Sequence, residues 1–326
     1  MKRAFLSLAT FAVLAAACGS QEQAQTDPRI GDRGLLRFNG GGCTGSTAMA
    51  VGSHETLTIE QVDGSALPED LTARTSAPEV IAARMHGENQ LTLEAHAAGE
   101  SHVDVLARGN SYDGLTFRAE PAAQATALSP PRVLAGGVLD VVVTDVFGDC
   151  KTSECPLFGQ GFLGWRTEPV SAMTFVGDEG GAAMFRAGDP GNVRVLGREP
   201  VRHVDLVSNW VSIEPTEGST GLVGELTTIP LEEGETPVVV ELPGSIPAGT
   251  AFCVRIDVVR EEGPNVAVSR KDVLWSVTGG IEVVPIDHGT EPLGTVFVAN
   301  AAGTASLTAR VGLVDLERAF ELTVTP

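Results

Sequence analysis

The sequence predicts an all-β protein made of tandem two-sheet β-sandwiches that follow an N-terminal export signal. Short runs alternate apolar and polar residues, and Gly, Pro, Asp or Asn interrupts them about every 8 to 15 residues. A similar pattern of residues recurs three times along the chain. No segment beyond residue 18 keeps a helical period over three turns. These observations favour half-buried strands over helices throughout the exported part.

Residues 1–17 are typical of an export signal. Lys2 and Arg3 precede a largely apolar run, and three alanines lead into Cys18. The apolar run is shorter than the roughly 20 residues that a membrane-spanning helix needs. Residues 14–18 (Leu-Ala-Ala-Ala-Cys) resemble the lipobox of bacterial lipoproteins, although the usual branched residue stands one place early. The resemblance implies a mature N-terminus at Cys18 that carries a diacylglycerol and an amide-linked acyl chain such as palmitate, and so a membrane anchor.

By the sorting rules of that family, Gly19 after the cysteine implies the outer membrane, with the protein facing the periplasm or the cell surface. The alternative is a plain secretory signal with Cys18 left as a thiol. Residues 18–33 contain little that can be buried and are expected to form a flexible tether.

Charge limits the partners that the protein can have. Removing Lys2 and Arg3 with the signal leaves 20 basic and 42 acidic side chains, a formal charge of −22. Such a surface repels nucleic acids and anionic lipid headgroups, so we expect no nucleic-acid partner.

Four cysteines remain after the lipidated one. Cys150 and Cys155 lie in one polar loop, where a short-range disulfide is plausible in an oxidising compartment. Cys43 and Cys253 then either bridge distant segments or stay unpaired, and their spacing does not choose between these outcomes. A zinc site is the rival interpretation, but no second close pair of Cys or His completes it.

The repeat aligns Ala73, Trp165 and Trp275, each followed after 26, 26 and 28 residues by a glycine that opens an alternating strand: Gly99, Gly191 and Gly303. Glycine suits this turn because it adopts positive φ without steric cost. The two tryptophans are expected to be large central side chains that fill the gap between the packed sheets.

Residues 51–59, 74–82 and 95–105 match the opening, middle and closing motifs of the bacterial immunoglobulin-like (Big-type) domains. The chain resembles this family over most of residues 34–326. The resemblance implies immunoglobulin-like sandwiches at residues 34–121, 122–208 and 209–326. The expected joints are residues 120–124 and 207–210.

Candidate chemical sites are few. Residues 159–164 fit the pattern G-x-G-x-x-G, but a strand and a helix do not flank them as a dinucleotide site requires, so we expect a tight loop and no cofactor. His96 and His102 are weak metal candidates. We expect them to be solvated histidines on an exposed hairpin, with Glu94 and Asp104 on the same face.

Asp145 and Asp149, near the cysteine loop, are spaced too widely for a typical calcium loop. No G-x-S-x-G elbow, P-loop, H-E-x-x-H or EF-hand loop occurs in the sequence.

Two functions remain. The first is a membrane-anchored, non-catalytic envelope lipoprotein whose domains act as a stalk or as a binding or adhesion module for a protein or glycan partner. The alternative is a hydrolase of envelope polymers or glycans, with two carboxyl groups that face one cleft. We favour the non-enzymatic function, because sandwich domains rarely form such a cleft on their own.

Overall fold

The computed structural model describes residues 29–40, 46–149, 156–179, 182–229, 238–242, 244–283 and 294–326. In these ranges the ordered backbone is β-strand apart from one short 3-10 turn, η1 (Arg270–Asp272). The all-β prediction is therefore confirmed. The chain forms two compact units. Of the described residues, unit 1 holds those up to Thr126 and those within Thr144–Gly164 and Gly197–Leu206. Unit 2 holds those within Ala127–Val143, Trp165–Leu196 and Val207–Pro326.

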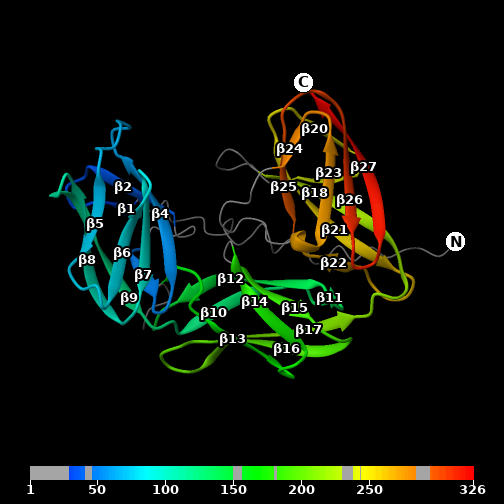
Figure 1. Cartoon of the computed structure of the whole chain (residues 1–326), viewed down its shortest axis with the longest axis horizontal. Helices are drawn as coiled ribbons and strands as arrows, with labels where there is room; N and C mark the ends of the chain where they lie inside the picture. The colour runs from blue at the N-terminus through cyan, green and yellow to red at the C-terminus, as the bar shows by residue number, and fades with distance from the viewer. Residues whose placement is uncertain are drawn as a thin grey trace. The chain divides into compact units, whose positions relative to one another are not determined.

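Within the described ranges, six sheets make three sandwiches (Figure 1). In the N-terminal sandwich, a five-stranded sheet has the order β1-β2-β4-β7-β6, with bounds Arg29–Ile30, Leu36–Asn39, His54–Gln61, Gln90–Ala95 and Ile81–His86. The facing sheet has the order β3-β9-β8-β5, with bounds Ala48–Ala50, Asn110–Glu120, Gly99–Ala107 and Leu71–Thr75.

The middle sandwich repeats this plan. One sheet has the order β10-β12-β15-β14, with bounds Gln124–Leu128, Val138–Phe147, Ala182–Ala187 and Met173–Glu179. The other has the order β11-β17-β16-β13, with bounds Arg132–Leu134, Asp205–Glu214, Gly191–Arg198 and Gly164–Glu168. Strand β17 runs without a break across residues 207–210, the segment that was expected to be a joint.

The C-terminal sandwich adds strands to the same plan. One sheet has the order β19-β18-β21-β25-β24, with β22 also paired to β21; the bounds are Val239–Glu241, Ser219–Ile229, Ala251–Arg260, Thr295–Ala299, Ile281–Val283 and Val266–Val268. The other has the order β20-β27-β26-β23, with bounds Gly244–Pro247, Leu316–Thr325, Gly303–Val311 and Val273–Thr278.

A short parallel pairing recurs in all three sandwiches. Strands β3, β11 and β20 pair in parallel with β9, β17 and β27, while β9 and β27 pair antiparallel with β8 and β26. The strand orders correspond to the ABED and GFC sheets of an immunoglobulin-like sandwich, with the first strand split so that its second half joins G. The immunoglobulin-like prediction is thus confirmed by the order and direction of the strands.

The predicted glycine-led strand also recurs. Gly99, Gly191 and Gly303 open β8, β16 and β26 with φ of 151°, 155° and 143°, values that a residue with a Cβ rarely adopts. In each sandwich this strand follows the crossing from one sheet to the other. The glycine therefore serves the change of sheet rather than a hairpin.

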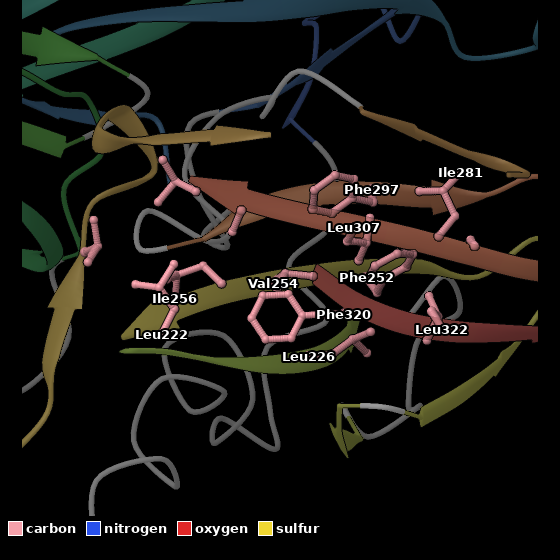
Figure 2. Packing of buried hydrophobic residues seen from close by; sticks show 14 of the residues in the cluster. Leu222, Leu226, Phe252, Val254, Ile256, Ile281, Phe297, Leu307, Phe320 and Leu322 are labelled. Carbon is pink, nitrogen blue, oxygen red and sulfur yellow. The ribbon is translucent and has the colours of Figure 1, made fainter. Parts of the chain in front are cut away.

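Each sandwich has its own apolar core, to which both of its sheets contribute. In the C-terminal sandwich, Phe252 and Phe297 stack with ring centroids 5.5 Å apart, and Figure 2 shows them with Phe320 and Leu307 between the layers. Burying one such side chain contributes about 1.5 to 3 kcal/mol, so these contacts hold the two sheets together.

The tryptophans of the repeat were predicted to fill the centres of the cores, and this prediction is wrong. Trp165 and Trp275 are only partly buried, and each makes an edge-to-face contact with a buried phenylalanine, Phe185 at 5.7 Å and Phe297 at 5.2 Å. Their strands, β13 and β23, are the last in their sheets. An edge position places a large side chain at the border of the core, and phenylalanines fill the centre.

A segment between β12 and β13 completes the core of the N-terminal sandwich. Residues 156–160 bond to β3 and to the start of β4: the Phe158 amide donates to the Ala48 carbonyl at 2.9 Å, and His54 and Gln160 exchange two hydrogen bonds of 3.0 and 2.9 Å. Phe158 is 3% exposed and belongs to the N-terminal core, with its ring centroid 6.2 Å from that of Phe117. Unit 1 therefore depends on chain from both sides of β12.

The first described strand is held in the same place. The Arg29 guanidinium lies 4.2 Å from the centre of the Phe158 ring and donates to the Ser46 and Gly40 carbonyls at 2.7 and 2.6 Å. Burial lowers the pKa of Arg29 to about 10, although the nearby charge of Glu55 acts to raise it. The group stays cationic at neutral pH. Strand β1, which lies within residues 18–33 that were expected to form the tether, is therefore fastened into the N-terminal sandwich.

Candidate functional site

The two candidate metal-binding histidines are not brought together on a hairpin. Strand β7, which ends just before His96, pairs with β4 and β6, whereas β8, which carries His102, pairs with β5 and β9. The hairpin prediction is wrong because the connection crosses from one sheet to the other, as it does in an immunoglobulin-like fold.

Each histidine faces its own carboxylates. His96 Nε2 lies 3.8 Å from Glu94, while His102 lies 3.4 Å from Asp104 and 3.7 Å from Asp32. Arg74 donates a hydrogen bond to Asp104 and lowers its pKa, so this carboxylate is already paired with a guanidinium. Among the described residues, no group of three or more His, Cys, Asp or Glu is arranged to hold a metal ion.

The glycines of residues 159–164 serve packing. Gly159 has φ of +103°, and a Cβ there would stand 2.2 Å from Ser53 Oγ. Gly161 has φ of +71°, and a Cβ there would stand 2.8 Å from the His54 ring. The run therefore lets the segment that carries Phe158 lie directly against the N-terminal sandwich. Gly164, the last glycine of the run, is the first residue of β13.

The lipidation and disulfide candidates fall mostly outside the described residues. This holds for Cys18, Cys43, Cys150 and Cys155. Cys253 lies on β21 and is buried, at 5% exposed. Of the two aspartates near the cysteine loop, Asp149 pairs with Arg202 at 3.3 Å, and Asp145 is exposed on β12.

One surface has the composition of a recognition site. Trp210 is 67% exposed and lies on β17 between the inward-facing Val207 and Val211. Because side chains alternate along a strand, Trp210 points outward with Ser208 and Ser212. The Trp210 face is the outer side of the sheet β11-β17-β16-β13 and includes Arg132, Arg166, Glu168, Arg194, Ser208 and Trp210.

Ion pairs hold the arginines of the Trp210 face in place. Arg194 donates to Ser208 Oγ at 2.8 Å and lies 3.8 Å from Glu168, which also pairs with Arg166 at 2.6 Å. These side chains are 40 to 46% exposed, so solvent screens the pairs and their contribution to stability is small. Their ordering matters more for recognition, because tryptophan and arginine are the residues most enriched at the centres of protein interfaces.

A small hollow lies at one end of the middle sandwich. It encloses about 210 Å³, and the residues around it include Pro169, Ser171, Ala172, Asp189, Pro190 and Asn192. Typical small-molecule sites enclose about 300 to 1,000 Å³, so this hollow admits no more than a small group. Asp189 is the one carboxylate in its lining, whereas glycoside hydrolysis normally uses a pair.

No helix in the described ranges is long and apolar enough to cross a membrane. Sequence reasoning missed the Trp210 face because it assigned residues 207–210 to a joint. The alternation of Val207, Val211 and Ile213 is the signal that could have identified a strand with an outward tryptophan.

No protein-family model matches this chain, and no curated protein matches its sequence. Solved structures with some similarity include domains 4–9 of the surface layer protein SbsC, at 14% identity and a TM-score of 0.32, over 83% of this chain and 42% of that one. The Escherichia coli adhesin FdeC has 14% identity and a TM-score of 0.26, over 85% and 94%. Invasin, a bacterial integrin-binding protein, has 14% identity and a TM-score of 0.25, over 89% and 59%.

This chain thus spans less than half of the SbsC fragment and about 59% of the invasin structure. TM-scores of this size support no argument about function. The immunoglobulin-like assignment rests on the strand orders.

Proposed function

We propose that this protein is a membrane-anchored, non-catalytic lipoprotein of the cell envelope whose immunoglobulin-like sandwiches act as a stalk and binding module. In this proposal, Cys18 carries the lipid in the outer membrane, and the protein faces the periplasm or the cell surface. Its partner is a protein or a glycan of the envelope, and the binding chemistry needs no cofactor.

The Trp210 face is the observation that carries the proposal. Trp210 is 67% exposed on a regular strand, and tryptophan is among the residues that contribute most binding energy at protein interfaces. Arg194, held by Ser208 and Glu168, and Arg166, held by Glu168, place ordered donors on the same face. Ordered donors lose little side-chain entropy on binding, so they favour recognition over general adhesiveness.

A crosslinking pull-down of the full-length protein from intact envelope tests the binding part of the proposal, whether or not Cys18 carries a lipid. Trp210→Ala should abolish the recovery of a stoichiometric partner and leave folding unchanged. Leu274→Ala is the matched control, because Leu274 is also 67% exposed but lies on β23 of the C-terminal sandwich. Equal recovery with wild type and Trp210→Ala would contradict the assignment of this face.

Membrane fractionation tests the anchor separately. Cys18→Ser should release the protein into the soluble fraction, because the lipid chains supply the hydrophobic attachment. A variant that still sediments with membranes after a salt and carbonate wash would disprove lipid anchoring. The pull-down result does not depend on this outcome, so the two parts of the proposal can fail independently.

A further inference from the structure

The strand β11 and the turn that follows it dock on the C-terminal sandwich within unit 2. Leu134, the last residue of β11, is 2% exposed and belongs to the C-terminal core. The Val138 amide donates to Asp272 Oδ2 in η1 at 2.6 Å. Arg186 pairs with Asp272 Oδ1 at 3.4 Å and donates to the Gly136 carbonyl at 2.9 Å. This docking junction therefore joins an apolar contact to a network of charged hydrogen bonds.

A second carboxyl group is buried beside this network. Asp140 on β12 is 3% exposed, and its Oδ2 atom has no hydrogen-bond partner among the described residues. The carboxyl group receives a hydrogen bond from Ser269, which is itself 4% exposed and precedes η1. A buried carboxylate with an unpartnered oxygen is costly, whereas the neutral acid removes most of that cost.

The charged groups around Asp140 come from two elements. Turn η1 supplies Arg270 and Lys271, which favour the ionised form, and Asp272, which opposes it. Strand β15 supplies Arg186, which is engaged with Asp272. The strands β10 and β22 contain no ionisable side chain.

Burial has the largest effect on Asp140. It raises the pKa of Asp140 from 3.8 to about 6, despite the hydrogen bond from Ser269 and the charges of Arg270 and Lys271. The group therefore titrates in the folded protein at a pH at which ordinary aspartates are already ionised.

We propose that this docking junction responds to the protonation of Asp140. When Asp140 takes up one proton from the solvent, the docking of β11 and β12 on η1 is strengthened. When Asp140 loses that proton, the docking is weakened. The site is internal to unit 2 and needs no ligand, so the inference does not depend on the lipid anchor or on the Trp210 face. In a compartment open to the medium, acidification would stiffen the chain at this point.

Hydrogen exchange on the folded chain tests whether the docking junction responds to pH. If opening of the docking junction exposes Asp140 to water, the pKa of Asp140 falls from its raised value to that of an ordinary aspartate. Because the docked state then binds the proton more tightly than the open state, opening should be about tenfold more frequent at about pH 7.5 than at about pH 5. After correction for the intrinsic pH dependence of exchange, peptides covering residues 132–138 and 269–272 should show this loss of protection. Peptides from β8 and β9 in unit 1 should not.

Three variants make the test specific. Asp140→Asn should give the same protection at both pH values, because the amide does not titrate. Asp145→Asn, on an exposed position of the same strand, should keep the wild-type response. Ser269→Ala removes a hydrogen bond to the ionised form and should move the midpoint to higher pH, so it serves as a second readout if Asp140→Asn folds poorly.

Equal protection of the junction peptides at the two pH values in the wild type would overturn the proposal. So would a wild-type pH response in Asp140→Asn, because another group would then be titrating.

Discussion

Replacing Phe158 with alanine should destabilise unit 1 and leave the C-terminal sandwich intact. Phe158 lies in the connection between β12 and β13, far along the chain from the N-terminal sandwich. Phe158 is nevertheless only 3% exposed and belongs to the N-terminal core. It contacts Phe117 edge to face at 6.2 Å and lies 4.2 Å below the Arg29 guanidinium. The substitution removes all of these contacts and keeps the backbone hydrogen bonds of residues 156–160.

The expected loss is about 3 to 5 kcal/mol, the usual cost of truncating a buried phenylalanine to alanine. The aromatic pair supplies roughly 0.5 to 1.5 kcal/mol of this, and the cation–π contact supplies a similar amount. For a domain of about 100 residues, each kcal/mol lowers the melting temperature by about 4 to 8 °C. A fall of roughly 12 °C or more in the transition of unit 1 is therefore expected.

The assay must resolve the two units, since a chain of several domains does not unfold in one step. All three tryptophans, Trp165, Trp210 and Trp275, lie in unit 2, so tryptophan fluorescence follows that unit. Pulse-labelling hydrogen exchange on β8 and β9 follows unit 1 along a urea series. Phe175→Ala is the control, because Phe175 is 44% exposed at the edge of the middle sandwich.

An unchanged urea midpoint for β8 and β9 in Phe158→Ala would refute the reasoning. An equal shift in the tryptophan signal would also count against it, because the lost contacts lie entirely within unit 1.

The remaining predictions concern single positions. Trp165→Ala should cost about 2 to 3 kcal/mol, less than for a fully buried tryptophan, and a tryptophan-fluorescence melt that includes Trp210 as reporter would detect it. Gly159→Ala should cost about 2 to 4 kcal/mol, because it adds backbone strain and a 2.2 Å clash with Ser53. Gly34→Ala is the control and should cost only the strain, because Gly34 has φ of +70° and nothing lies within 4 Å of its added Cβ. Equal urea midpoints for the two variants would contradict this prediction. Because the pKa of Asp140 is raised to about 6, the folded state holds its proton between pH 3.8 and 6 and the free energy of unfolding falls as pH rises through that window. Asp140→Asn should therefore stabilise unit 2 by about 2 to 3 kcal/mol near pH 7.5 and hardly at all near pH 4, and a stability–pH curve parallel to that of wild type would refute the assignment.

Much of the fold was predictable, because its signals are local. The alternation that marks β7, β16 and β26 is visible within a few residues, and the glycines at positions 99, 191 and 303 are required by the backbone at those points. The depth of burial was less predictable. Trp165 matched the repeat, but whether a strand lies at the edge or the centre of a sheet is decided by pairing with distant strands.

The candidate sites show the same division. The expected hairpin at His96 and His102 failed because alternation does not reveal whether consecutive strands pair or face each other across a core. The Trp210 face could be inferred from the spacing of Val207 and Val211, but only once the segment was taken as a strand.

By itself, the sequence determined that this chain is built of glycine-punctuated β-strands in a repeated pattern, because period-two alternation and backbone-restricted glycines act within a few residues. The immunoglobulin-like arrangement of those strands was implied only by a family resemblance. Only the tertiary structure decided that Phe158 completes a core far from it in sequence, and that Asp140 lies buried beside Asp272. Both depend on long-range packing and on the exclusion of water. Neither is visible in a chain until its segments have come together.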